Sequence, residues 1–184
     1  MKVQGLNSSS RKTKKLIQNT FLELLNEKKE LNKISVTELV KRAEITRSTF
    51  YTHYESIYEV AQEYEDQAIE LLHFNDDDLN SIEEIENYFD DIIRYLKENE
   101  ETYKMLLSAN ETFYFLQKLQ KKAYQKLTFS LKKVIKTNSY LELDISFFMD
   151  GILSELLKYF RNQSDYTLDE LSYNMKKWFK KIII

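Results

Sequence analysis

The chain has 184 residues, of which 42% are hydrophobic and 31% are charged, and its net charge is -3 at pH 7. It contains no cysteine, no proline and only 2 glycines. These values exclude disulfide frameworks and cysteine nucleophiles, and they leave almost no residues for the tight turns of β-hairpins and phosphate-binding loops.

Capping signals mark where the helices begin. A Ser or Thr followed three residues later by Glu is typical of a helix N-terminus, because both side chains accept N–H groups that the first turn leaves unpaired. This pattern begins at Ser35, Ser56, Ser81 and Thr167, and Thr46 is a cap without the reciprocal Glu. Between these caps the apolar residues recur at spacings of three and four, which predicts amphipathic helices.

The spacing predicts an all-α chain of about nine helices. In chain order they span residues 11–27, 36–43, 47–54, 57–73, 82–98, 100–109, 111–137, 142–162 and 168–182. The first three are short and closely linked. They predict an N-terminal helix-turn-helix head over residues 8–55, followed by a helical-bundle body over residues 56–184.

The two ends of the chain differ in charge. Residues 1–54 hold 11 Lys and Arg against 5 Asp and Glu, a net charge of +6, and residues 55–184 hold the remaining 16 against 25, a net charge of -9. A basic segment joined to an acidic body is typical of a nucleic-acid-binding head. Uneven surface charge with no partner is the alternative that charge alone leaves open.

The helices predicted at 36–43 and 47–54 are joined by about three residues, the spacing of a helix-turn-helix unit. On the second helix Phe50 and Tyr54 lie four residues apart, and we expect both to point inward. The outward arc then carries hydrogen-bonding side chains at its N-terminal end, as a helix that reads the major groove requires. These side chains are Arg47, Ser48, Tyr51 and Thr52.

Each residue of this arc suits a particular contact. Arg47 has the geometry for a bidentate contact to guanine O6 and N7, and Ser48 and Thr52 suit base edges or a thymine methyl group. Tyr51 and His53 have the reach for phosphate oxygens. A tight helix pair inside a bundle is the structural alternative. DNA binding is favoured because the unit coincides with a basic set, Arg11, Lys12, Lys14, Lys15, Lys41 and Arg42.

The stretch from Ile34 to Tyr54 resembles the DNA-binding signature of the TetR family of bacterial one-component regulators, most specifically in the block Thr49-Phe50-Tyr51-x-His53-Tyr54. The resemblance covers residues 12–60. It implies an all-helical dimer in which three N-terminal helices bind DNA and the last two helices dimerise.

The resemblance also implies roles for individual residues. It assigns phosphate contacts to Tyr51 and His53, base contacts to the residues around Arg47 and Ser48, and a backbone contact to Thr37. Together with the residue chemistry it gives one set of candidate DNA contacts: Lys12, Lys14, Lys15, Thr37, Thr46, Arg47, Ser48, Thr49, Tyr51, Thr52 and His53.

Two positions depart from the family pattern. Glu44 stands where a turn glycine is common, so a left-handed backbone there would be strained. Ile57 replaces a lysine that often holds a phosphate. A fainter resemblance, carried by residues 97–107 and 148–171, points to C-terminal regions of such regulators from low-GC Gram-positive bacteria.

The body carries two further predictions. The last two helices each have a continuous apolar stripe, and we predict that they form a four-helix dimer interface with Leu153, Leu156, Leu157, Phe160, Leu171, Met175 and Trp178 on its shared or inner faces. A pocket for a small apolar or aromatic effector is predicted at Tyr64, Ala68, Leu72, Tyr88, Tyr103 and Met105. Aromatic side chains at this spacing also suit an ordinary core.

The sequence therefore predicts a cytoplasmic, homodimeric DNA-binding regulator, a ligand-responsive repressor acting on a palindromic double-stranded operator. The rival reading is a helical regulator controlled by a protein partner. No Walker loop, nucleophile elbow or HExxH motif is present, and we predict no enzyme activity, catalytic residue, metal or cofactor. The chain also lacks the ~20-residue apolar run of a membrane helix and the apolar core of a secretory signal.

Overall fold

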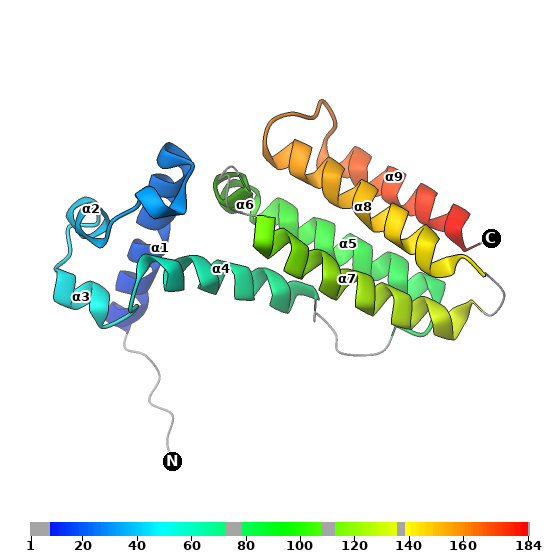
Figure 1. Cartoon of the computed structure of the whole chain (residues 1–184), viewed down its shortest axis with the longest axis horizontal. Helices are drawn as coiled ribbons and strands as arrows, with labels where there is room; N and C mark the ends of the chain where they lie inside the picture. The colour runs from blue at the N-terminus through cyan, green and yellow to red at the C-terminus, as the bar shows by residue number, and fades with distance from the viewer. Residues whose placement is uncertain (1–7, 73–78, 108–112, 136–138, 184) are drawn as a thin grey trace, which may run out of the picture.

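The computed structural model describes residues 8–72, 79–107, 113–135 and 139–183, and for Ala68, Leu71, Leu72 and residues 113–115 it describes the backbone alone. Within these residues the chain is all-helical and has no strand. The helices are α1 (Ser8–Lys28), η1 (Leu31–Lys33), α2 (Val36–Arg42), α3 (Arg47–Tyr51), α4 (Ile57–Leu72), α5 (Ile82–Glu98), α6 (Glu100–Leu107), α7 (Phe113–Val134), α8 (Leu141–Phe160) and α9 (Leu168–Ile182) (Figure 1). The all-α fold is confirmed, and α2 and α3 are short as predicted, whereas α1 has 21 residues and is not short.

The predicted caps occupy their expected positions. A hydroxyl oxygen accepts the backbone N–H three residues later at Ser35, Thr46, Ser56, Ser81 and Thr167, at 3.2, 3.0, 3.4, 3.1 and 3.2 Å. The reciprocal bond of the capping box is complete at Thr167, where Glu170 accepts the Thr167 N–H at 2.9 Å. These bonds explain why the helices begin where the sequence predicts, since each supplies an acceptor to the first turn.

The head consists of α1, α2 and α3 around a small core. Ile17, Phe21 and Leu24 of α1, Leu39 of α2 and Phe50 of α3 have no solvent exposure. Helix α1 packs against α2 and α4, and α2 packs against α3. The head forms one end of the molecule in Figure 1, with α2 and α3 outermost.

Two features of the head differ from the predictions. The short helix η1 was not predicted. Helix α3 ends at Tyr51 and not at residue 54, because the backbone N–H groups of His53 and Tyr54 both turn back to the Phe50 carbonyl oxygen, at 2.9 and 3.0 Å. This tight turn still directs the Tyr54 ring into the core, where 3% of the residue is exposed.

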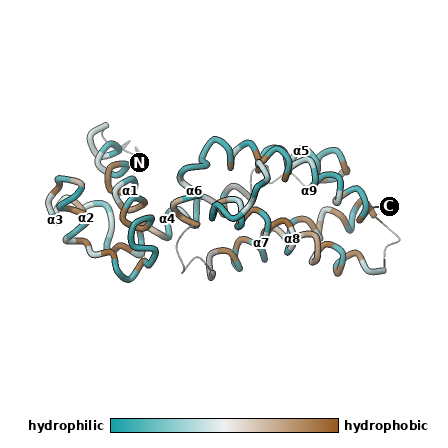
Figure 2. Tube along the Cα trace, turned by 90° about the horizontal axis from the view of Figure 1, so that it is seen from above, coloured by the Kyte–Doolittle hydropathy of each residue, from teal (hydrophilic) through white to brown (hydrophobic). Residues whose placement is uncertain are grey.

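The body is a bundle in which α5, α7, α8 and α9 run along one another. Helix α8 packs between α7 and α9, and α5 packs against both α7 and α9. Viewed from above, α5 and α9 lie on one side and α7 and α8 on the other, with hydrophilic and hydrophobic positions alternating along each helix (Figure 2). The core is aromatic at its centre, where Phe89 meets Phe179 edge-on at 5.0 Å between ring centroids and Phe148 lies 5.9 Å from both.

Two helices link the head to the body. Helix α4 begins at Ile57 in the head and packs against α7 of the body, and α6 packs against both α1 and α8. Because α4 contributes to both parts, the division at residues 55 and 56 stays a prediction. Of the helices in the described segments, none is long and apolar enough to cross a bilayer.

Candidate nucleic-acid interface

The turn between α2 and α3 sets the direction of α3. Glu44 adopts a left-handed backbone with φ of 52°. The next residue, Ile45, donates its N–H to the Val40 carbonyl oxygen at 3.0 Å, and the Thr46 hydroxyl then caps α3. The sequence left the conformation of this position open, and the structure shows that it is left-handed, where a residue with a Cβ is strained.

Helix α3 has one buried side and one exposed side. Phe50 has no solvent exposure and Tyr54, just beyond the helix, is 3% exposed. The opposite side carries Arg47, Ser48, Tyr51 and Thr52, all exposed, and 56% of Tyr51 is accessible to solvent. The structure thus brings the predicted outward residues together on one surface of a short, capped helix.

Arg47 is held by a second candidate DNA contact. Its Nη2 donates to the Thr37 hydroxyl of α2, and both side chains are exposed. The pair therefore spans the two helices of the helix-turn-helix unit. A guanidinium held in this way keeps donors facing solvent, because an arginine has five N–H groups and Thr37 takes one of them.

Three other predicted hydroxyls, those of Thr46, Thr49 and Thr52, are engaged within the chain. The Thr46 and Thr49 hydroxyl oxygens lie 2.8 Å apart, and Thr46 also caps α3. The Thr52 hydroxyl donates to the Ser48 carbonyl oxygen at 2.9 Å. Thr46 and Thr49 thus have a structural role in the turn. The remaining candidate, His53, lies just after α3 and is half-buried.

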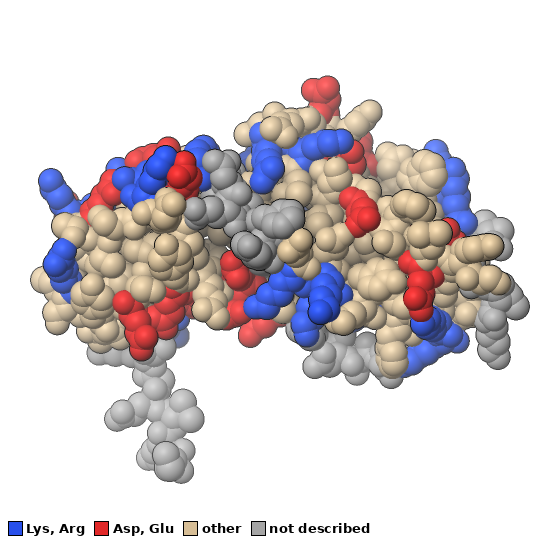
Figure 3. Space-filling model, viewed as in Figure 1, with Lys and Arg blue, Asp and Glu red and all other residues tan. Residues whose placement is uncertain are grey.

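The basic side chains of the head fall into two groups. Arg42 forms two hydrogen bonds to the Glu27 carboxylate, at 2.5 and 2.9 Å, and Lys28 pairs with Glu38 at 2.8 Å. The second group is Arg11, Lys12, Lys15 and Lys41, which are exposed and for which no ion pair is found among the described residues. Figure 3 shows Lys and Arg side by side with Asp and Glu over the head, so internal pairs offset part of the positive charge of residues 1–54.

Lys14 belongs to a polar cluster at the junction of three elements. Its Nζ lies 2.7 Å from Oε1 of Glu63 on α4, and the Tyr54 hydroxyl donates to Oε2 of the same carboxylate at 2.7 Å. The Lys14 ammonium also lies 5.6 Å from the centroid of the Tyr54 ring. We call Lys14, Tyr54 and Glu63 the head clamp, because it joins α1, the end of the helix-turn-helix unit and α4.

The head clamp shifts the pKa values of its members. Burial raises the pKa of Glu63, but the hydrogen bonds from Lys14 and Tyr54 favour the charged form more strongly, so the pKa lies below its ordinary value. Burial and the neighbouring carboxylate raise the pKa of the Tyr54 hydroxyl. Glu63 is therefore an anion and Tyr54 a neutral donor at neutral pH. A buried tyrosine hydroxyl needs a partner, but no spacing in the sequence identified Glu63 as that partner.

Replacing Glu63 with glutamine is expected to lower the free energy of unfolding at pH 7 by about 1 kcal/mol, because the amide keeps the tyrosine bond and loses the ion pair in a partly solvated site. The contribution of Glu63 is present above pH 4.5, its ordinary pKa, and is lost as the pH falls through the lower folded-state pKa. Urea unfolding at pH 7 and pH 3 measures both effects. Tyr54→Phe is the control that removes the hydroxyl alone, and equal acid sensitivity of Glu63→Gln and the wild type would contradict the assignment.

The predicted dimer residues lie on two different faces. Leu153, Leu157 and Phe160 line a cavity inside the bundle. Leu171 and Trp178 line an outer groove of about 590 Å³ between α8 and α9. Leu156 and Met175 contribute to both. The outer groove also contains Phe147, which is 69% exposed, and Gly151, where an added Cβ would meet nothing within 4 Å.

The predicted pocket residues do not form a single site. Tyr88 and Tyr103 line the cavity inside the bundle. Tyr64 stacks on Phe21 with ring centroids 6.2 Å apart and lines a second, polar groove between α1, α4 and α6, which Tyr103 lines as well. Met105 packs against the core without lining the cavity. The side chains of Ala68 and Leu72 lie outside the described part of the structure. No three His, Asp or Glu side chains in the described segments are placed to hold a metal ion.

The helix order and the arrangement of head and body match those of known regulators. The chain aligns with a TetR transcriptional regulator from Streptococcus agalactiae 2603V at a TM-score of 0.66 and 23% identity, covering 96% of both chains. It has the TetR fold. No family model and no curated protein matches the sequence.

Two further solved structures share the TetR fold with this chain. The dihydroxyacetone kinase operon activator DhaS aligns at a TM-score of 0.65 and 19% identity, over 92% of this chain and 96% of DhaS. A transcriptional regulator of the TerR/AcrR family from Aquifex aeolicus VF5 aligns at 0.60 and 23%, over 92% and 99%. The shared fold extends over the body as well as the head.

Proposed function

We propose that the chain is a DNA-binding transcriptional regulator, and not an enzyme, that acts in the cytoplasm as a homodimer on a palindromic operator. The observation that carries the proposal is the exposed arc of α3, on which Arg47, Ser48, Tyr51 and Thr52 face solvent from a capped helix of a helix-turn-helix unit. Side chains at the N-terminal end of such a helix reach base edges in the major groove.

In this proposal the contacts divide into two kinds. Arg47 and Ser48 read base edges, since they lie at the start of α3. The exposed Lys12 and Lys15 of α1, together with Tyr51 and His53, bind phosphate oxygens and fix the register of the head. Lys14 contributes indirectly, because Glu63 holds its ammonium within the head clamp.

The homodimer follows from the size of the head. One three-helix head covers too few base pairs for high specificity, whereas a two-fold dimer reads two half-sites. The outer groove of α8 and α9 supports the assignment of the dimer face, since it leaves Phe147 and Trp178 69% and 58% exposed in the single chain. Repression results when the dimer occupies DNA that the polymerase needs, and loss of affinity on ligand binding would relieve it.

The direct test is a gel shift with the full-length protein and DNA from upstream of its own gene, competed with unrelated DNA of the same length. We expect a shifted band that specific DNA competes away and unrelated DNA does not. A reporter gene placed behind the shifted fragment then measures whether the protein represses or activates transcription. Both outcomes are tested because one structural neighbour, DhaS, is named as an operon activator. Equal competition by both DNAs would overturn the proposal.

Alanine at Arg47 is expected to cost about 1–3 kcal/mol of binding free energy at the operator and to relax the preference at one base pair in each half-site. Fluorescence anisotropy against operators substituted one base pair at a time measures the preference. Lys12→Ala is the matched control, since a lost phosphate contact weakens all sequences alike and reduces the salt slope by about one unit. A uniform loss in Arg47→Ala would assign Arg47 to the backbone.

A further inference from the structure

Two arginines of the head are held in different ways. Arg42 donates two hydrogen bonds to the Glu27 carboxylate, at 2.5 and 2.9 Å, so an anion offsets its charge. Arg47 donates to the neutral hydroxyl of Thr37, and the described part of the chain contains no ion pair of Arg47. The Arg47 guanidinium therefore has a fixed neighbour and keeps its full positive charge.

Both ends of the Arg47 side chain are fixed. At its backbone end, the Thr46 hydroxyl accepts the Thr49 N–H at 3.0 Å and lies 2.8 Å from the Thr49 hydroxyl, which holds the first turn of α3 in place. At its free end, the guanidinium meets Thr37 in the first turn of α2, ten residues earlier in the chain. This bond spans the left-handed turn at Glu44, so it forms only at the angle that the turn sets between α2 and α3.

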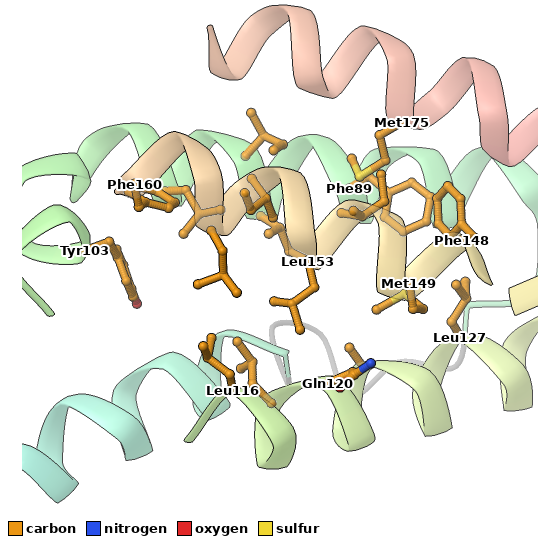
Figure 4. Close-up of a pocket in the computed structure, with 18 of the residues that line it drawn as sticks. Phe89, Tyr103, Leu116, Gln120, Leu127, Phe148, Met149, Leu153, Phe160 and Met175 are labelled. Carbon is orange, nitrogen blue, oxygen red and sulfur yellow. The ribbon is translucent and has the colours of Figure 1, made fainter. Parts of the chain in front are cut away.

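The pair belongs to the head and not to the cavity inside the bundle. Helices α2 and α3 are outermost at the head end of the molecule (Figure 1), whereas the side chains that line the cavity come from α5 to α9 (Figure 4). Thr37 and Arg47 are both exposed. The guanidinium is thus held at the surface that the proposed function assigns to DNA.

We infer that Thr37 is a positioning residue for base recognition, because its hydroxyl holds Arg47 in the orientation that contacts a guanine. This inference rests on the proposed function and deepens it. A mobile arginine loses side-chain freedom when it binds a base, and an arginine that is already held loses less. The gain applies only where Arg47 finds its guanine, since another base does not order the guanidinium. Thr37 therefore increases the discrimination between bases.

The Thr37 hydroxyl has capacity for a second partner. A hydroxyl accepts through two lone pairs and donates one proton, and Arg47 occupies one of the lone pairs. The proton is available to a phosphate oxygen, which is the backbone contact that the family resemblance implies for Thr37. The two roles have different signatures. A phosphate contact acts on every sequence alike, whereas holding Arg47 affects the one base pair that Arg47 contacts.

The test is Thr37→Val, which keeps the branching of the side chain and removes the hydroxyl. Fluorescence anisotropy against operators substituted one base pair at a time should show that the preference at the base pair contacted by Arg47 falls about 2- to 10-fold, the range for ordering one long side chain. Preferences at the other positions should stay as in the wild type. Thr37→Ser keeps the hydroxyl and should restore the preference. A uniform change over all operators would overturn the inference and leave Thr37 as a phosphate contact alone.

A double-mutant cycle tests whether Thr37 acts through Arg47. In the Arg47→Ala background, Thr37→Val should have no further effect on base preference, since the side chain that it holds is gone. A further loss of preference in that background would contradict the inference. Thr13→Val is the matched control and should leave every base preference unchanged, because the Thr13 hydroxyl donates to the Ser9 carbonyl oxygen of its own helix, at 3.1 Å.

A measurement without DNA separates this inference from the proposed function. NMR order parameters of the arginine Nε–H groups in the free full-length protein report how firmly each guanidinium is held. Thr37→Val should lower the value of Arg47 and leave that of Arg42, which Glu27 holds. An unchanged Arg47 value would overturn the inference even in a protein that binds its operator. If the Arg47 value falls and the protein shows no preference for its upstream DNA, the proposed function and the role of Thr37 in base recognition both fail, while the contact between Thr37 and Arg47 stands.

Discussion

Alanine at Phe50 is expected to lower the free energy of unfolding by about 3–5 kcal/mol, the range for removing a fully buried phenylalanine ring. Phe50 has no solvent exposure and its ring is packed between Tyr51 and Tyr54, with centroids 5.4 and 6.0 Å away. The loss should abolish DNA binding because α3 depends on this ring for its attachment to the head. Urea unfolding followed by circular dichroism measures the effect. Tryptophan fluorescence is less suitable, because the single tryptophan, Trp178, lies in the body and not in the head.

The neighbouring position supplies the control. Tyr51→Ala removes an aromatic ring that is 56% exposed, so the free energy of unfolding should change by less than about 0.5 kcal/mol. Its DNA affinity should fall all the same, because the phenol is a proposed phosphate contact. A stable Phe50→Ala variant, or a Tyr51→Ala variant with full DNA affinity, would reverse the assignment of the two faces of α3.

Glutamate at Trp178 is expected to convert the protein to monomers and to lower operator affinity by about 1000-fold or more, the difference between specific and non-specific binding. The indole is 58% exposed in the single chain, so the fold does not depend on it. In the proposed dimer it is buried in the outer groove of α8 and α9, where an unpaired carboxylate is costly. Analytical ultracentrifugation gives the mass and gel shifts give the affinity.

The charges along this groove indicate how two copies would pair. Asp144 and Lys181 line one end of the groove, and Glu155 lines it farther along α8. A two-fold axis that sets the two α8 helices antiparallel would bring Lys181 of one copy toward Glu155 of the other. Tyr173→Glu is the matched control, because Tyr173 is 67% exposed on α9 and does not line the groove. A dimeric Trp178→Glu variant with normal operator binding would place the interface elsewhere.

Local chemistry made the helix starts and the head predictable. Caps act within four residues, so Ser35, Ser81 and Thr167 mark helix starts from sequence alone. The inward position of Phe50 was predictable because its spacing to Tyr54 keeps both on one side. The end of α3 was missed because residues 52–54 continue a hydrogen-bonded turn whose pattern resembles that of a helix.

Long-range partners were not predictable. Lys14, Tyr54 and Glu63 meet only because three elements pack together, and no spacing encodes that contact. The two apolar faces of α8 could not be separated either, since Leu153 and Leu156 share one stripe although Leu153 faces the cavity and Leu156 reaches the outer groove as well. A helix that contacts neighbours on two sides has the periodicity of one broad apolar face.

The left-handed residues have a consequence for how this chain can change. Lys29, Glu44 and Asn162, at the ends of α1, α2 and α8, have φ of 59°, 52° and 54°, and none is a glycine. Each residue with a Cβ gives up about 1–2 kcal/mol in this conformation, less for asparagine. Replacing one of these three exposed residues with glycine would therefore raise the free energy of unfolding, and the gain would offset a destabilising substitution elsewhere in the head or body. At Glu44 the replacement by glycine would also remove a negative charge beside α3, so folding stability and attraction to DNA would increase together.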